Sequence, residues 1–208
     1  MSAGVLIAFE GIDGSGKSTQ ARRFTQWLRD RGADVLLTRE PTDGPWGRKI
    51  REARFTERLS PEDELHAFLE DRREHVASEL APALARGAVV VVDRYYYSTV
   101  AYQGARGLDP SALLQRNRAF APRPDLVVLV DVPPRRALER IAARGEGQDL
   151  FESLAQLTAV RERFLALASE PHVVVLDGEG DEAAVFSRVL ETLLSGPLRA
   201  WAAHHLPT

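Results

Sequence analysis

The sequence predicts an α/β fold: a parallel sheet of about five strands, with helices on both faces and a short mobile lid. Two observations support this prediction. Short apolar runs rich in valine and leucine recur along the chain, which is typical of strands buried on both faces. Segments with apolar residues at helical spacing lie between these runs. Strands that alternate with helices in this way form a parallel sheet with right-handed crossovers.

The expected strands, in chain order, are Val5–Phe9, Asp34–Thr38, Ala88–Val92, Leu126–Val130 and Val173–Leu176. The first predicted helix runs from Ser18 to Gly32. A second helix begins after Ser60, where a capping serine precedes Pro61 in the first turn. Pro82 should bend or end that helix. Further helices are expected to open at Pro110, at Pro133, near Leu150 and around Asp181.

A phosphate-binding loop lies between the first strand and the first helix. It reads Gly11-Ile12-Asp13-Gly14-Ser15-Gly16-Lys17-Ser18, and Thr19 follows it. In this setting backbone N–H groups and a helix N-terminus point at one anion. Lys17 reaches the β- and γ-phosphates of a nucleoside triphosphate, and the Ser18 hydroxyl ligates Mg²⁺. The loop therefore predicts a P-loop NTPase-type fold whose residues 11–19 bind nucleotide.

Charged residues follow three of the predicted strands, at the carboxyl ends where open α/β sheets bind ligands. They are Arg39 and Glu40 with Pro41, Asp93 with Arg94, and Asp131. Asp93 is suited to hold the magnesium shell, and Arg94 could clamp a second phosphate. The alternative for Asp93 and Arg94 is a strand-capping ion pair, which the phosphate-binding loop makes the weaker interpretation.

Composition narrows the choice of protein class. The net charge of −3 argues against a surface that coats nucleic acid, and the absence of cysteine excludes disulfides and thiolate zinc sites. The apolar N-terminal stretch stops at Glu10, and no run approaches the roughly 20 apolar residues of a membrane span. We therefore expect a cytoplasmic protein with neither a nucleic acid nor a membrane as partner.

Several short motifs occur along the chain in a characteristic order and spacing. They are Phe9–Thr19, Thr38-Arg39-Glu40-Pro41, Phe68 through Asp71-Arg72, Asp93-Arg94-Tyr95 with Ser98, Ala101, Tyr102 and Gln103, and Arg140–Gly145 before Phe151-Glu152. With these motifs the chain resembles the thymidylate kinase family of the P-loop nucleoside monophosphate kinase superfamily. The resemblance implies a single P-loop kinase domain over residues 1–208, with a lid at about 140–152. It also implies a homodimer.

The resemblance implies an acceptor site for dTMP, made of Asp13, Arg39, Pro41, Phe68, Arg72, Arg94, Thr99, Tyr102 and Gln103. Phe68 is expected to stack on thymine. Arg72 lies four residues later on the same helix face and would donate to a base carbonyl. Thr99 and Gln103 would face the pyrimidine, and Tyr102 would back the sugar.

The implied reaction transfers the γ-phosphoryl group of ATP to the 5′-phosphate of dTMP, with Mg²⁺ as cofactor. The expected catalytic residues are Lys17, Asp13, Arg94, Arg144 and Arg140. Ser18 and Asp93 would hold the metal. Arg144 would act from the lid with Arg140 in support, because the loop has no cation besides Lys17. Where relatives commonly have Asp-Arg-Phe-Glu, the chain has Leu150 in place of the arginine.

Two alternatives stay open on the sequence alone. The enzyme could act on another deoxynucleotide or on a nucleoside. The chain could also be a P-loop protein that binds nucleotide without appreciable turnover, although such a protein has no need of an acceptor site. Tyr96 and Tyr97 have no role in either case and are expected to pack in the core.

Overall fold

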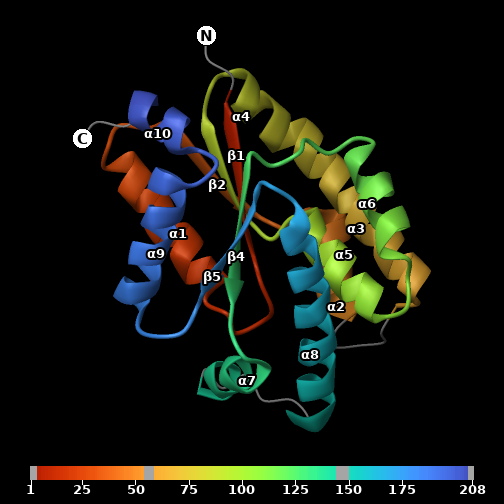
Figure 1. Cartoon of the computed structure of the whole chain (residues 1–208). Helices are drawn as coiled ribbons and strands as arrows, with labels where there is room; N and C mark the ends of the chain where they lie inside the picture. The colour runs from red at the N-terminus through yellow and green to blue at the C-terminus, as the bar shows by residue number, and fades with distance from the viewer. Residues whose placement is uncertain (1–3, 54–58, 144–149, 206–208) are drawn as a thin grey trace.

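Five parallel strands form one sheet in the order β2-β3-β1-β4-β5, which confirms the predicted fold class (Figure 1). They are β1 (Val5–Glu10), β2 (Val35–Arg39), β3 (Val89–Asp93), β4 (Leu126–Asp131) and β5 (Val173–Asp177). Asp93 lies opposite Phe9 on one side and Arg39 on the other, so these three strands end together. The computed structural model describes residues 4–53, 59–143 and 150–205, without the side chains of residues 150–153.

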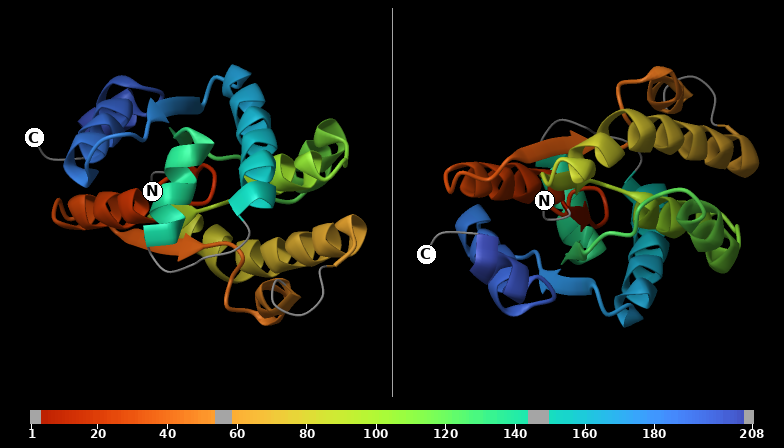
Figure 2. Two further views of the ribbon diagram at one scale, coloured as in Figure 1. Left: turned by 90° about the horizontal axis from the view of Figure 1, so that it is seen from below. Right: turned by 90° about the horizontal axis from the view of Figure 1, so that it is seen from above.

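Helices cover both faces of the sheet (Figures 1 and 2). One face carries α1 (Lys17–Arg29), α9 (Glu182–Ser195) and α10 (Arg199–His205). The other carries α3 (Pro61–His75), α4 (Ala81–Ala85), α5 (Tyr96–Ala105), α6 (Pro110–Arg118) and α8 (Leu150–Ala166). The helix α2 (Pro45–Ala53) packs beside α3, and α7 (Pro134–Ala143) lies at the carboxyl ends of the strands.

The strand sequences explain this two-sided core. In β1, Leu6 and Ala8 pack toward the α3–α5–α8 side, whereas Ile7 and Phe9 pack toward α1 and α9. All four side chains are at most 1% exposed. Successive side chains of a strand point to opposite faces, so a continuous apolar run is required where both faces are covered.

The helix starts were mostly predictable. Ser60 caps α3 by accepting a hydrogen bond from the backbone N–H of Asp63 at 3.1 Å. Tyr96 and Tyr97 are buried in the core as expected, but they belong to a helix, α5, that was not predicted from the sequence. The helix α2 was also not anticipated.

Pro82 was expected to bend or end its helix, and the structure shows a local change of helix type. A π turn spans Val76–Leu80 and leads directly into α4. At its end the N–H of Ala81 donates to the carbonyl of Val76, five residues back. The wider turn alters the hydrogen-bond register just before a residue that has no N–H to donate, so the helix continues to Ala85.

Candidate active site

The phosphate-binding loop joins β1 to α1 at the carboxyl edge of the sheet. Two of its glycines have no room for a side chain. A Cβ at Gly14 would lie 2.3 Å from the carbonyl oxygen of Ala137, and one at Gly11 would lie 2.5 Å from that of Val130. Both glycines have a positive φ, 80° and 143°, which L-residues rarely adopt. The tight turn and the close contacts with α7 and β4 thus explain the loop composition.

Lys17 is buried inside this loop. Its Nζ donates to the carbonyl of Ile12 at 3.3 Å, so the ammonium group lies across the loop that it belongs to. Burial, together with the nearby positive charge of Arg94, lowers the pKa of Lys17 from 10.5 to about 8. A buried cation of this kind is stabilised by a bound polyanion, which is the role expected from the sequence.

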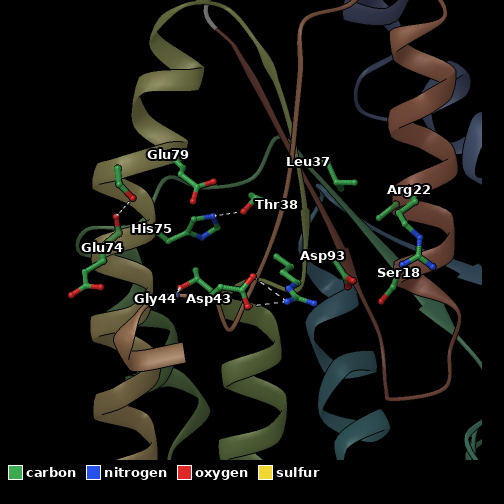
Figure 3. A pocket seen from close by; sticks show the side chains of 14 residues that line it. Ser18, Arg22, Leu37, Thr38, Asp43, Gly44, Glu74, His75, Glu79 and Asp93 are labelled. Carbon is green, nitrogen blue, oxygen red and sulfur yellow. Dashed lines mark hydrogen bonds and ion pairs between the residues drawn. The ribbon is translucent and has the colours of Figure 1, made fainter. Parts of the chain in front are cut away.

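Ser18 and Asp93 line a cavity of about 690 Å³ beside the loop. Figure 3 shows them on one side of this cavity, with His75 and Glu79 across from them. Asp93 Oδ1 is buried and has no hydrogen-bond partner among the residues that the structure describes. An unpartnered carboxylate oxygen next to a hydroxyl is a donor set suited to Mg²⁺. Within the described chain no three His, Cys or acidic side chains gather as a metal site, so such an ion would need phosphate and water ligands too.

Arg94 connects the loop to α5. Its Nη2 donates to Asp13 Oδ1 at 2.7 Å and to the Tyr102 hydroxyl at 3.3 Å, and its Nη1 donates to Ser98 Oγ at 2.9 Å. The Tyr102 hydroxyl also donates to Asp13 Oδ2 at 3.0 Å. Burial lowers the pKa of Arg94, but Tyr102 and Asp13 outweigh that effect and raise it overall. The guanidinium is therefore permanently charged and held beside the phosphate-binding loop.

The backbone of Arg94 is strained. Its φ of 67° makes it the single non-glycine residue with a positive φ in the described part of the chain. A left-handed conformation at such a residue costs about 1–3 kcal/mol and occurs mainly at functional sites. The N–H of Arg94 donates to the carbonyl of Phe9 at 2.9 Å, which fixes this turn against β1.

Glu10, which immediately precedes the loop, is completely buried. Its Oε1 accepts from the backbone N–H groups of Tyr95 at 2.8 Å and Ser98 at 3.1 Å, and its Oε2 accepts from Ser98 Oγ at 2.6 Å. These groups lie on the N-cap residue and in the first turn of α5, so Glu10 caps that helix from the end of β1. Burial raises the pKa of Glu10 from 4.5 to about 7, although the hydrogen bonds and Arg94 oppose this. No pattern in the sequence predicted this role for Glu10.

Arg72 is 1% exposed, and most of its N–H groups donate to other residues of the protein. Its Nε and Nη2 donate to Glu40 Oε2 at 2.8 and 2.5 Å, Nη2 also donates to Thr99 Oγ1 at 3.1 Å, and Nη1 donates to Asn117 Oδ1 at 2.5 Å. The guanidinium of an arginine carries one N–H on Nε and two on each Nη. One N–H on Nη1 thus has no acceptor among the described residues. Glu40 Oε1 also pairs with His75 Nδ1 at 3.0 Å, and because an ionised carboxylate only accepts hydrogen bonds, the ring N–H is the donor.

Phe68 and Gln103 complete the expected base-facing set. Phe68 is half-buried, unlike Leu65 and Leu69 on the same helix, which are 3% and 4% exposed. Gln103 is 1% exposed, and its Nε2 donates to Glu64 Oε2 at 2.6 Å. A partly exposed aromatic ring beside buried polar groups is suited to bind a planar, polar ring.

Arg39 and Pro41 lie on the loop that leaves β2. The Arg39 side chain is 62% exposed and pairs with Asp43 at 2.9 Å. Pro41 follows a cis peptide bond, and its carbonyl accepts from Arg51 at 3.0 Å. The Arg39 side chain therefore pairs with Asp43 and not with the hydrogen-bonded group of Arg94, Asp13 and Tyr102.

Of the two arginines expected to act from the lid, Arg140 lies within the described residues. Arg144, the expected catalytic arginine, lies outside the described residues. Arg140, at the end of α7, donates from Nη1 to the carbonyl of Ser15 and from Nη2 to that of Gly178, both at 3.0 Å. It thus contacts the phosphate-binding loop itself.

Comparisons with known proteins agree on one family. The sequence model for "Thymidylate kinase" matches residues 9–189. The chain is 48% identical to the thymidylate kinase of Xanthomonas campestris pv. campestris (strain B100), over 97% of this chain and 89% of the relative. It is also 48% identical to that of Akkermansia muciniphila, over 91% of each. The crystal structure of thymidylate kinase from Ehrlichia chaffeensis has a TM-score of 0.76 and 29% identity, over 92% of this chain and 100% of that one.

The burial of Glu10 makes a testable contribution to the pH dependence of stability. A carboxyl whose pKa is raised in the folded state favours folding at low pH, and this contribution is lost as the pH rises through about 7. We expect Glu10→Gln to remove this effect. Between about pH 5 and about pH 8 the free energy of unfolding of the wild type should fall by up to about 3 kcal/mol more than that of the variant.

Urea denaturation at the two pH values measures this difference. Glu70→Gln is the matched control, because Glu70 is a partly exposed carboxyl of α3 that pairs with Arg73. Equal pH dependence in the wild type and Glu10→Gln would show that Glu10 is ionised as readily in the folded as in the unfolded chain.

Proposed function

The chain belongs to the thymidylate kinase family, and from this premise we propose how its own residues transfer a phosphoryl group from ATP to dTMP. Membership of this family makes the chain an ATP-dependent phosphotransferase that converts dTMP to dTDP. Of the alternatives left by the sequence, a kinase for another acceptor and a non-catalytic P-loop protein are therefore not retained. The roles of the individual residues are our proposal.

The observation that best supports these roles is the contact between Arg94 and Asp13. Asp13 belongs to the phosphate-binding loop, whereas Arg94 directly follows β3 and reaches Tyr102 on α5. We assign the loop to ATP and the space along α3 and α5 to dTMP. The two phosphates would then meet at Arg94, which is where charge must be neutralised.

On the donor side, loop N–H groups and Lys17 would hold the β- and γ-phosphates. Ser18 and Asp93 would hold Mg²⁺, because Asp93 Oδ1 is buried and lacks a partner in the described part of the chain. When bound, the ion neutralises charge on the phosphate oxygens. Arg140 would support the loop through the carbonyl of Ser15.

On the acceptor side, Phe68 would stack on thymine. The remaining N–H of Arg72 would donate to the carbonyl oxygen at C4, with Thr99 and Gln103 beside it. Tyr102 would back the sugar. These assignments rest on the half-exposed ring of Phe68 and on the two helices α3 and α5, which hydrogen bonds hold together.

The chemistry then needs no strong general base. A phosphate oxygen of dTMP, already ionised, attacks the γ-phosphorus of ATP, and the bond to the β–γ bridging oxygen breaks to release ADP. Lys17 and Arg94 would neutralise the oxygens around the transferring group, and the fixed geometry would align the two phosphates. Asp13 would hold Arg94 and face the acceptor sugar.

We also propose that the protein is a cytoplasmic homodimer. Within the described chain no helix combines the length and the apolar character needed to cross a bilayer. Light scattering of the purified protein and fractionation of cells test the two parts of this proposal.

The acceptor preference follows from the base-facing residues. We expect dTMP to be the best substrate, dUMP to be weaker and dCMP to be poor. Loss of the methyl contact should cost about 1–3 kcal/mol in kcat/KM, and a mispaired buried polar group should cost more. Coupled measurement of ADP release with each nucleotide tests this order, and faster turnover of dAMP, dGMP or thymidine would contradict it.

The donor site predicts different effects for two substitutions. Lys17→Ala should lower kcat by about 100-fold or more, since it removes a cation from the transferring phosphoryl group. Asp93→Asn should raise the magnesium concentration needed for half-maximal rate, with little change in the KM for dTMP. Steady-state kinetics with excess ATP measure both. Near-normal turnover of Lys17→Ala would exclude this lysine from the mechanism.

The two lid arginines, Arg144 and Arg140, should differ in their effect on kcat and kcat/KM. Arg144→Ala should lower kcat and kcat/KM together by about thirty- to a thousand-fold, because its interaction is expected only in the transition state. Arg140→Ala should cost less, because Arg140 donates to backbone carbonyls of the loop. A change confined to the KM for ATP in Arg144→Ala would make Arg144 a binding residue instead.

A further inference from the structure

Two hydrogen bonds join the antiparallel helices α3 and α5 along the proposed acceptor site. At one level Arg72 Nη2 donates to Thr99 Oγ1 at 3.1 Å, and at the other Gln103 Nε2 donates to Glu64 Oε2 at 2.6 Å. Glu64, Phe68 and Arg72 follow one another at four-residue spacing on one face of α3. The half-buried ring of Phe68 therefore lies between the two hydrogen-bonded levels.

Glu64 determines how the amide of Gln103 is oriented. An ionised carboxylate only accepts hydrogen bonds, so the –NH₂ group of the amide must face it and the oxygen must face away. Glu64 is itself fixed, because it forms an ion pair with Arg106, which also donates to the carbonyl of Leu59 at 2.9 Å. The side chains of Glu64 and Arg106 are 15% and 16% exposed, so solvent weakens this pair little.

The oxygen of the same amide has no partner. Gln103 Oε1 is buried, and no described residue donates to it. Buried polar atoms in folded proteins nearly always find a hydrogen-bond partner, and an exception calls for a physical cause. If the amide turned over, Oε1 would face the carboxylate of Glu64 and two acceptors would meet. The acceptor atom is thus kept available at the cost of leaving it unpaired.

The two unpaired groups form a pattern that one type of pyrimidine matches. Arg72 has one N–H without an acceptor in the described chain, and Gln103 has one oxygen without a donor. Thymine and uracil present an acceptor at O4 and a donor at N3–H. Cytosine presents the reverse, a donor at its 4-amino group and an acceptor at N3. A donor next to an acceptor therefore suits the first two bases and opposes the third.

We propose that Glu64 is a positioning residue that sets base specificity, by holding the Gln103 amide with its oxygen toward the N3–H group of the pyrimidine. This inference rests on the acceptor site assigned above. Glu64 does not touch the base, and it acts through Gln103 alone. It selects pyrimidines with an N3–H donor against cytosine and is indifferent to the methyl group.

Kinetics of three nucleotides test the proposal. In Glu64→Gln the partner of Gln103 can donate as well as accept, so the amide is free to turn. We expect the ratio of kcat/KM for dTMP to that for dCMP to fall by about tenfold or more. The ratio for dTMP to dUMP should stay unchanged, since these bases share the same polar edge. A ratio of dTMP to dCMP that stays within about threefold of wild type would overturn the proposal, as would a parallel fall of both ratios.

Two further variants make the test independent of folding and charge. Glu70→Gln removes a carboxylate from the same helix, away from Gln103, and should leave both ratios unchanged. Glu64→Asp keeps the charge but withdraws it by one methylene, and should change the ratio in the same direction as Glu64→Gln. If Glu64→Gln does not fold, a wild-type ratio in Glu64→Asp would overturn the proposal.

The double variant Glu64→Gln with Gln103→Glu adds a rescue. A carboxylate at position 103 offers acceptors in both orientations and needs no partner to orient it, so discrimination against dCMP should return. Absence of rescue would overturn the proposal. Gln103→Leu separates this inference from the site assignment: an unchanged dTMP to dCMP ratio there would remove Gln103 from the base site, whereas a loss in Gln103→Leu but not in Glu64→Gln would refute only the role of Glu64.

Discussion

The buried carboxylate of Glu10 is the interaction on which the rest of the site depends. It ends β1 directly before the phosphate-binding loop, and it binds the first-turn N–H groups of α5. The loop is the proposed donor site, and α5 carries the proposed acceptor side chains Thr99, Tyr102 and Gln103. One buried group therefore sets the position of the two halves relative to each other. A reaction that relies on alignment of two phosphates needs such a fixed relation more than it needs a reactive side chain.

The same corner of the molecule holds two cations, Lys17 and Arg94, that are largely shielded from water. Burial is the largest cause of the lowered pKa of Lys17, and the charge of Arg94 adds to it. The acidic side chains of Asp13, Asp93 and Glu10 oppose this lowering without cancelling it. Two cations in such surroundings repel each other and are poorly solvated. Phosphate groups relieve both effects, so the site is arranged in advance for anions and needs little reorganisation when they arrive.

Local patterns in the sequence predicted the sheet and the phosphate-binding loop. Both features are encoded by consecutive residues, a β-branched run for each central strand and a glycine-rich motif for the loop. The helix α5 escaped prediction: its start, Tyr95-Tyr96-Tyr97, reads as a buried aromatic run, and its N-terminus is capped by a residue 85 positions away. The hydrogen-bond partners of Arg72 and Gln103 could not be predicted either, because they too lie far away in the sequence. Asn117 lies 45 residues from Arg72, and Glu64 lies 39 residues from Gln103. Contacts across such separations leave no periodic signal.

The hydrogen bonds between α3 and α5 limit how this enzyme can change over evolutionary time. Arg72 and Glu40 form a fully buried ion pair, and removal of one partner of such a pair strands a charge in the interior. The side chains that would discriminate between bases are thus also side chains that hold two helices together. A broader acceptor range cannot be reached through them without weakening the fold. Compensating substitutions elsewhere would have to come first, which makes a narrow substrate range the evolutionarily stable condition.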